Sequence, residues 1–178
     1  MKGFTKGMLL AALTVLALPF AARAEDRKAS DTEPTTDQEF LAKAIDINSG
    51  EVKMAEKALK ESENKAVRAF AQEMIDGHTK LRNDFMRLAK SKRVAVVEGL
   101  GATAREQMTN LGKLRGRDFD REYISYQIAD HEKALKLFKT WSKKATDSEL
   151  RELSSKEATK VEEHLRLAKD VQAKLKGR

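Results

Sequence analysis

The sequence contains no cysteine, only two prolines and one tryptophan among its 178 residues. Without cysteine the chain can form no disulfide, no thiolate metal site and no cysteine nucleophile, so a hydrophobic core has to hold the fold. The apolar run from Met8 to about Phe20 is too short to cross a bilayer as a helix, which takes roughly 20 residues. A glycine-rich nucleotide-binding loop and the serine elbow of hydrolases are also absent. These absences favour a soluble, non-enzymatic protein.

The N-terminus has the pattern of a secretory signal peptide. Two early lysines are followed by the short apolar run and by an Ala-Arg-Ala cleavage pattern at residues 22–24. We therefore expect residues 1–24 to be a signal peptide and the polar residues 25–36 to be a flexible leader. Residues 37–176 are long enough to bury one core and are predicted to form a single domain. The mature protein is predicted to reach the periplasm or cell envelope without a transmembrane span.

Charge is nearly balanced in the predicted mature chain. The whole sequence carries a formal net charge of +7, and loss of residues 1–24 leaves 32 basic and 28 acidic residues, or +4. Basic and acidic residues alternate along the predicted helix faces, which is typical of a solvated surface and not of a basic stripe. We predict no nucleic-acid partner.

Apolar residues recur at helical spacing in four long segments. The segments are residues 37–60, 65–90, 119–144 and 147–175. Thr36 and Glu39 have the spacing of a capping box before the first segment, and Thr146 and Glu149 have it before the last. Asp118 is the expected N-cap of the third segment.

The lengths of the connections predict the order of the helices. Two short connections join the first and second segments, and the third and fourth, into antiparallel hairpins. The connection over residues 91–116 is long enough to return along the bundle and contains a short helical pattern at 103–114. The sequence thus predicts an all-α fold, a ferritin-like up-down-down-up four-helix bundle with a long crossover that contains a short extra helix.

The only three histidines lie on the apolar stripes of three different helices. They are His78, His131 and His164. At a rise of about 1.5 Å per residue, these positions and Glu51 fall within about 8 Å of one another along the bundle axis. We therefore predict that the four side chains face a common interior. Each histidine also has an acidic residue close before it, namely Asp76, Asp130 and Glu163.

One interpretation of these residues is a metal site. Imidazole and carboxylate groups on facing helices bind zinc, copper or iron, and Glu51, His78, His131 and His164 would be the ligands. Met74 could add a soft ligand for copper or simply fill the core. The Glu-x-x-His motif of di-iron proteins is absent, which disfavours ferroxidase or oxygenase chemistry. The residues three before the histidines are Ile75, Ile128 and Val161.

The alternative interpretation is a structural network, in which buried polar groups satisfy one another without a metal. Amides and acids on the same stripes are numerous enough to do this. The expected pairs are Asn48 with His78, Gln127 with His164, and either Glu51 or Glu157 with His131, and Asp130 and Glu163 would support the same centre.

Several segments resemble those of an exported bacterial family described as domain of unknown function 4142. The most specific stretches are residues 119–123, 129–134 and 137–138, and weaker ones are 49–52, 70–72, 74–75, 78–80 and 163–165. The resemblance covers roughly residues 37–174 and implies export and a ferritin-like bundle, but no activity. Family members usually carry an aspartate directly before the histidine of the second helix, where this chain has Gly77.

Three functions are compatible with these features. The first is an exported, non-enzymatic bundle protein of the cell envelope, related to stress, with a buried histidine and carboxylate centre. The second is a periplasmic metal-binding protein that uses the three histidines. The third is an envelope interaction module that meets a protein partner through its charged helix faces or through the connector at residues 92–101.

Overall fold

The computed structural model describes residues 33–96 and 99–177. Over these residues the only regular secondary structure is helical, without a strand. The helices are α1 (Asp37–Glu61), α2 (Lys65–Ser91), α3 (Ala102–Leu111), α4 (Gly116–Lys144) and α5 (Ser148–Lys176). The predicted signal peptide, and the predicted leader up to residue 32, lie outside the described residues. No helix among the described residues is long and apolar enough to span a membrane.

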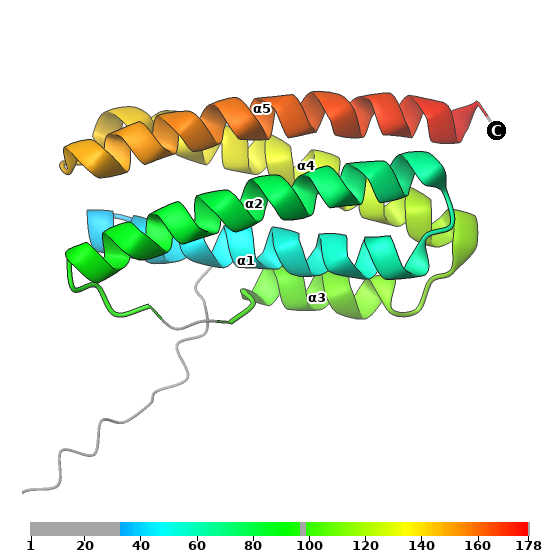
Figure 1. Ribbon diagram of the computed structural model, residues 1–178, viewed down its shortest axis with the longest axis horizontal. Helices are drawn as coiled ribbons and strands as arrows, with labels where there is room; N and C mark the ends of the chain where they lie inside the picture. Colours follow the sequence, from blue (N-terminus) through cyan, green and yellow to red (C-terminus); the bar gives the residue numbers. More distant parts are fainter. Residues whose placement is uncertain (1–32, 97–98, 178) are drawn as a thin grey trace, which may run out of the picture.

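The long helices run up, down, down and up (Figure 1). α1 pairs with α2 and α4 pairs with α5, while α2 packs against α5 and α1 against α4 to close the bundle. The crossover returns along the bundle and lets α4 run parallel to α2, and α3 lies against α1 and α4 (Figure 1). The predicted ferritin-like bundle, including the short helix in the crossover, is confirmed.

One of the two predicted capping boxes is confirmed. Thr36 Oγ1 accepts a hydrogen bond from the amide of Glu39 at 3.2 Å, and Glu39 Oε2 accepts one from the amide of Thr36 at 3.3 Å. At α5, however, Asp147 is the N-cap and accepts from the amide of Leu150 at 3.0 Å. The prediction of Thr146 was wrong because its amide and hydroxyl donate to Asp37 instead.

The start of α4 also differs from the expectation. The helix begins at Gly116, after Arg115, and Asp118 lies in its first turn without acting as the N-cap. Gly116 has a φ of 54°, in the left-handed region that favours glycine. The turn at Gly116 therefore starts the helix earlier than the polar side chain of Asp118 suggested.

The core consists of two apolar clusters with a polar layer at mid-height. One cluster includes Phe70, Phe119 and Tyr123 near the α1–α2 turn, and the other includes Phe40 and Phe138 near the α4–α5 turn. Most of the buried side chains outside these two clusters are polar. They include Asn48, Glu51, His78, Gln127, His131, Glu157 and His164. The fold therefore places the polar stripe positions of four helices in one interior layer.

Candidate metal centre

The three histidines meet in the polar layer. His78 from α2, His131 from α4 and His164 from α5 are at most 1 % exposed. Their ring centroids lie 4.9–5.7 Å apart. One nitrogen from each ring can be chosen so that all three lie within 4.8 Å of one another. The predicted convergence of the imidazoles is thus observed, while their role as metal ligands stays a prediction.

His78 is held by the predicted partner, Asn48. The Nδ1 atom of His78 lies 2.9 Å from Asn48 Oδ1. The amide of Asn48 donates to the carbonyl of Ala44 at 2.9 Å, which orients its oxygen toward the ring. Because an amide oxygen only accepts, Nδ1 carries the proton of His78 and Nε2 keeps its lone pair. The lone pair faces His164.

His131 is held by its own helix. Its Nδ1 atom donates to the carbonyl of Gln127 at 2.8 Å, so the lone pair again lies on Nε2. This Nε2 atom is buried and has no hydrogen-bond partner. Glu51 Oε1 lies 3.9 Å from Nδ1, beyond hydrogen-bond length, and Glu51 Oε2 accepts from the Gln127 side chain at 2.8 Å. Glu51 therefore lies behind the ring, outside the three-histidine group.

His164 contacts His78 and not Gln127, contrary to the predicted pair. Its Nδ1 atom lies 3.1 Å from His78 Nε2. Since that Nε2 atom is an acceptor, the proton between the two rings belongs to Nδ1 of His164. The Nε2 atom of His164 is buried and without a partner. Gln127 was placed on the correct stripe, but its side chain turns to Glu51.

Glu157 lies on the Asn48 side of the layer. Its Oε1 atom is 3.8 Å from His78 Nδ1 and has no hydrogen-bond partner, while Oε2 accepts from the Asn48 amide at 3.4 Å. The sequence correctly placed Glu157 in the centre. The expected choice of Glu51 or Glu157 as a hydrogen-bond partner of His131 was wrong, because the backbone takes that role.

The acids that precede the histidines in the sequence do not contact them. Asp76 accepts from Gln72 on the exposed face of α2, and Glu163 accepts from Lys160 at 2.7 Å on the surface. Asp130 accepts from Gln107 of α3 at 2.5 Å. Adjacent helical residues point about 100° apart, so a neighbour of a buried residue faces elsewhere. Glu163 therefore lies outside the centre, contrary to the expectation, and Asp130 acts on it only through its charge near Glu51.

Sequence analysis missed the acid that does approach His164. Glu73 on α2 places Oε1 4.0 Å from His164 Nε2. Gly77, one turn later, leaves the space that the ring of His164 uses: an added Cβ would lie 2.8 Å from its Cε1 atom and 3.0 Å from Nε2. An aspartate at this position would force the ring to move.

Burial keeps the centre uncharged near neutral pH. It lowers the pKa of His131 to about 4 and that of His164 to about 3, and it also holds the pKa of His78 well below its ordinary value. Burial raises the pKa of Glu51 to about 8, with a further rise from the charge of Asp130, and raises that of Glu157 to about 8. The contacts of His131 with Glu51 and of His78 with Glu157 are therefore contacts between neutral groups, not ion pairs.

Met74, the candidate soft ligand, is fully buried and belongs to the apolar cluster of Phe70 and Tyr123. Its position supports the role of core filler.

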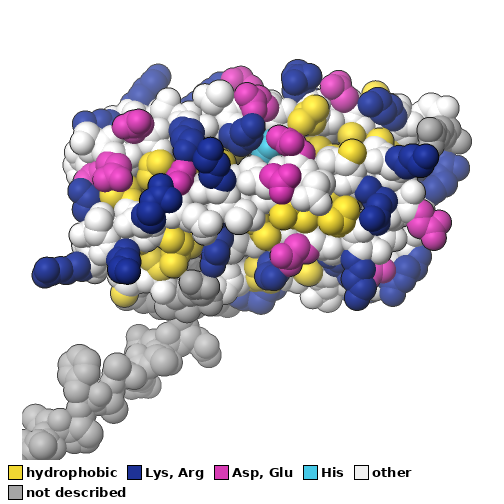
Figure 2. Space-filling model, viewed as in Figure 1, with side chains coloured by type: hydrophobic (Ala, Val, Ile, Leu, Met, Phe, Trp, Pro, Cys, Tyr) yellow, Lys and Arg dark blue, Asp and Glu magenta, His cyan; other side chains and the backbone are white. Residues whose placement is uncertain are grey.

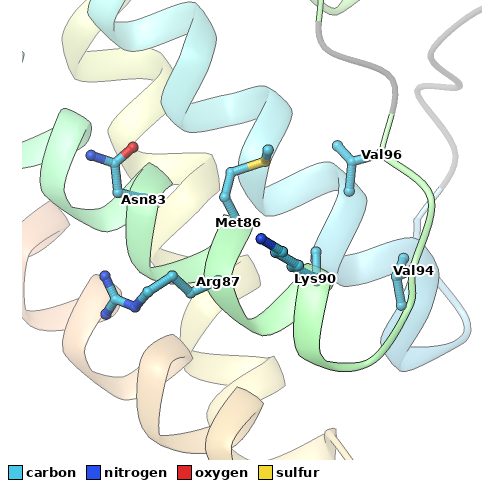
Figure 3. Close-up of a pocket in the computed structure, with 7 residues that line it drawn as sticks. Asn83, Met86, Arg87, Lys90, Val94 and Val96 are labelled. Carbon is cyan, nitrogen blue, oxygen red and sulfur yellow. The ribbon is translucent and has the colours of Figure 1, made fainter.

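Elsewhere, a groove of about 560 Å³ lies between the end of α2 and the connector (Figure 3). Met86 and Lys90 line it from α2, and Val94 and Val96 line it from the connector. Among the described residues that line it there is no group of metal ligands.

Solved structures with the same fold are found at low sequence identity. A protein described as secreted, DUF305 from Streptomyces coelicolor, matches with a TM-score of 0.67 and 16 % identity over 79 % of this chain and 94 % of its own. CopM in its Cu(II)-bound form matches with a TM-score of 0.66 and 19 % identity, over 79 % of this chain and 97 % of its own. At these identities the matches establish the fold alone.

Sequence comparison identifies the family. No curated protein matches the chain. The model of one family, described as Domain of unknown function (DUF4142), matches residues 21–171, which include the three histidines and every long helix almost to its end. The resemblance noted in the helix sequences is therefore confirmed, and the chain belongs to the DUF4142 family.

Proposed function

We propose that the protein is an exported, non-enzymatic metal-binding bundle that holds one transition-metal ion with His78, His131 and His164. The observation that carries the proposal is the group of three buried imidazoles whose donor atoms lie within 4.8 Å, with Nε2 of His131 buried and without a partner. An unpaired buried acceptor is uncommon in a core that serves packing alone. Export is supported by the signal-peptide pattern of residues 1–24 and by the secreted DUF305 neighbour.

The donor atoms fit a small metal ion. Neighbouring ligands of a tetrahedral site with metal–nitrogen bonds of about 2.0–2.1 Å lie roughly 3.3 Å apart. His78 Nε2 and His164 Nδ1 lie 3.1 Å apart. The outer partners fit as well, because Asn48 and the Gln127 carbonyl hold the Nδ1 protons of His78 and His131 and so keep the lone pairs of both rings on Nε2, as ligand histidines require. The widest separation, 4.8 Å, requires a side-chain movement of about 1.5 Å.

Copper and zinc are the ions that this donor set favours. Imidazole nitrogen binds Cu²⁺ and Zn²⁺ well, and Cu²⁺ more tightly at a given site. The CopM neighbour is known in its Cu(II)-bound form, which supports copper as the first ion to test. Glu51, predicted as a fourth ligand, lies on the far side of His131. We propose that it loses its proton when the ion binds and then offsets the charge of the ion without binding it directly.

The test is metal binding by protein prepared without an affinity tag. We expect one equivalent of Cu²⁺ or Zn²⁺ per chain in elemental analysis after reconstitution and gel filtration. Metal at 100 times its Kd should stabilise the fold by about 2.7 kcal/mol, which corresponds to a rise in Tm of about 5–10 °C for a domain of this size. His131→Ala should remove both the bound metal and the rise.

A suitable control is Tyr123→Phe, two turns earlier on the same stripe of α4. It removes a buried hydroxyl that has no hydrogen-bond partner and leaves the histidines in place. This variant should bind metal like the wild type. If the folded wild type retains no metal and its Tm does not respond, the proposal is contradicted and the structural network is favoured.

The groove beside the connector supports a second candidate function, an envelope interaction module. Apolar side chains of Met86, Val94 and Val96 line it together with the charged Arg87 and Lys90. If a protein partner uses this groove, replacement of both valines by serine should abolish its capture from an envelope extract. The His131→Ala variant should still capture it. Equal capture by all variants would contradict a role for the groove.

A further inference from the structure

Without a metal ion, Nδ1 of His164 has no lone pair available for metal binding. The proton of this ring lies on Nδ1 and is donated to His78 Nε2 at 3.1 Å. Two of the three candidate ligand atoms are therefore engaged with each other. A metal ion needs the lone pairs of both His78 Nε2 and His164 Nδ1. The N–H bond at Nδ1 of His164 therefore has to break, and its proton passes to water.

A neutral imidazole keeps one N–H, so the ring takes a proton from water at Nε2 as it loses the one at Nδ1. The exchange changes the tautomer and leaves the charge of the ring unchanged. An N–H group at this buried position needs an acceptor, since an unpaired buried donor costs about 1–3 kcal/mol. His78 and His131 already have such acceptors in Asn48 and the Gln127 carbonyl. The corresponding acceptor for His164 is the missing part of the site.

Glu73 is the carboxylate nearest to that atom, with Oε1 4.0 Å from His164 Nε2. The gap is about 1 Å longer than a hydrogen bond. The Glu73 side chain is 48 % exposed and lies one helical turn before Gly77, whose missing Cβ leaves the edge of the His164 ring open toward α2. A change of side-chain rotamer can therefore close the gap without a movement of the backbone.

The surroundings allow this movement. Lys160 lies 3.9 Å from Glu73 but 2.7 Å from Glu163, so Glu163 is its closer partner. The surface view shows a small area of histidine between acidic and basic side chains, on the face formed by α2 and α5 (Figure 2). The His164 ring itself is buried, so it is the half-exposed Glu73 side chain that approaches it from this face.

We infer that Glu73 is a positioning residue that accepts the Nε2–H of His164 and so turns the Nδ1 lone pair of that ring toward the centre. The inference rests on the proposed metal-binding function. Glu73 does not bind the ion itself and acts only through His164. Each histidine then has its own outer acceptor: an amide, a backbone carbonyl and a carboxylate.

The test uses Zn²⁺, which is diamagnetic, and the full mature chain. Long-range ¹H–¹⁵N spectra of the imidazoles report the tautomer of each ring, and competition with a chelating dye reports the affinity. The wild type should show His164 as the Nδ1–H tautomer without zinc and as the Nε2–H tautomer with it. Glu73→Ala should weaken zinc binding by about 10–100-fold. Glu73→Gln should restore part of the loss, because its amide oxygen can accept the same proton.

Glu163→Ala is the matched control. Glu163 is 51 % exposed and pairs with the same lysine, but it does not contact His164. Its variant should bind zinc within about threefold of the wild type. Unchanged affinity in Glu73→Ala, or an Nδ1–H tautomer of His164 in the zinc-bound wild type, would overturn the role of Glu73 alone. A wild type that binds no zinc would overturn this role and the proposed function together.

Discussion

Phe138→Ala is expected to lower the free energy of unfolding by about 3–5 kcal/mol. Phe138 is fully buried on α4, in the apolar cluster near the α4–α5 turn. Its ring makes an edge contact with Phe40 at 5.6 Å and a tilted contact with Phe85 at 6.1 Å. Removal of the ring leaves a cavity bounded by α1, α2 and α4, and the stacked pair of Phe40 and Trp141 cannot fill it without losing its own contact.

Urea denaturation followed by far-UV circular dichroism would measure the loss. Leu137→Ala is the matched control, because Leu137 is the adjacent residue and is only partly buried against the same cluster. It should cost clearly less than Phe138→Ala. A loss of less than about 1 kcal/mol for Phe138→Ala would mean that α4 does not present this face to the core.

The position of the histidines could be predicted because it depends on two regular quantities. The helical repeat places His78, His131 and His164 on inward stripes, and the lengths of the two hairpins place them at the same height. Both quantities can be read from the sequence, and neither depends on the conformation of a side chain. The same reasoning placed Asn48 and Glu157 in the layer.

The hydrogen bonds of the centre could not be predicted in the same way, because they depend on rotamers and on residues distant in the sequence. Gln127 faces inward, as expected, yet its amide turns to Glu51 and only its backbone carbonyl holds a histidine. Glu73 has the pattern of a surface residue, and its approach to His164 depends on the space at Gly77.

The N-cap of α5 also depends on a residue distant in the sequence. Thr146 has the side chain and spacing of an N-cap, but Asp37, at the start of α1, takes its amide and hydroxyl hydrogen bonds. Asp147 then caps α5. A contact between residues 109 positions apart thus overrides a local pattern that is otherwise reliable. Local signals predicted where each helix lies, but they identified the N-cap side chain correctly only for α1.

The metal-free protein is expected to be most stable near pH 6.5 and to lose stability on both sides of it. On the acid side, burial lowers the pKa of His131 to about 4 and of His164 to about 3, and that of His78 also falls well below its ordinary value. The unfolded chain binds protons at these residues below about pH 6.5 and the folded chain does not. Their contribution to stability is therefore lost as the pH falls.

On the alkaline side the sign is reversed. Burial raises the pKa of Glu51 and of Glu157 to about 8, from ordinary values near 4.5. The folded chain holds these protons in the window from about pH 4.5 to 8 and the unfolded chain does not, so their contribution is lost as the pH rises. Between about pH 4.5 and 6.5 the three histidines change the stability more than the two carboxyls do, so stability rises with pH. Above about pH 6.5 only the carboxyls still change it, and stability falls. We expect a loss on the order of 2 kcal/mol between pH 6.5 and 8.

Urea denaturation in a chelator, repeated from pH 4 to 8.5, measures this profile. In the Glu51→Gln, Glu157→Gln double variant the alkaline loss should disappear while the acid loss remains, because the amides cannot titrate and the histidines stay buried. Glu132→Gln is the control: Glu132 is 50 % exposed and pairs with Lys169, so its variant should keep the wild-type profile. Stability that stays constant or rises between pH 6.5 and 8 in the wild type would show that the two carboxyls are ionised in the fold. The interior would then already carry two negative charges, and the layer of neutral groups inferred from burial would be wrong.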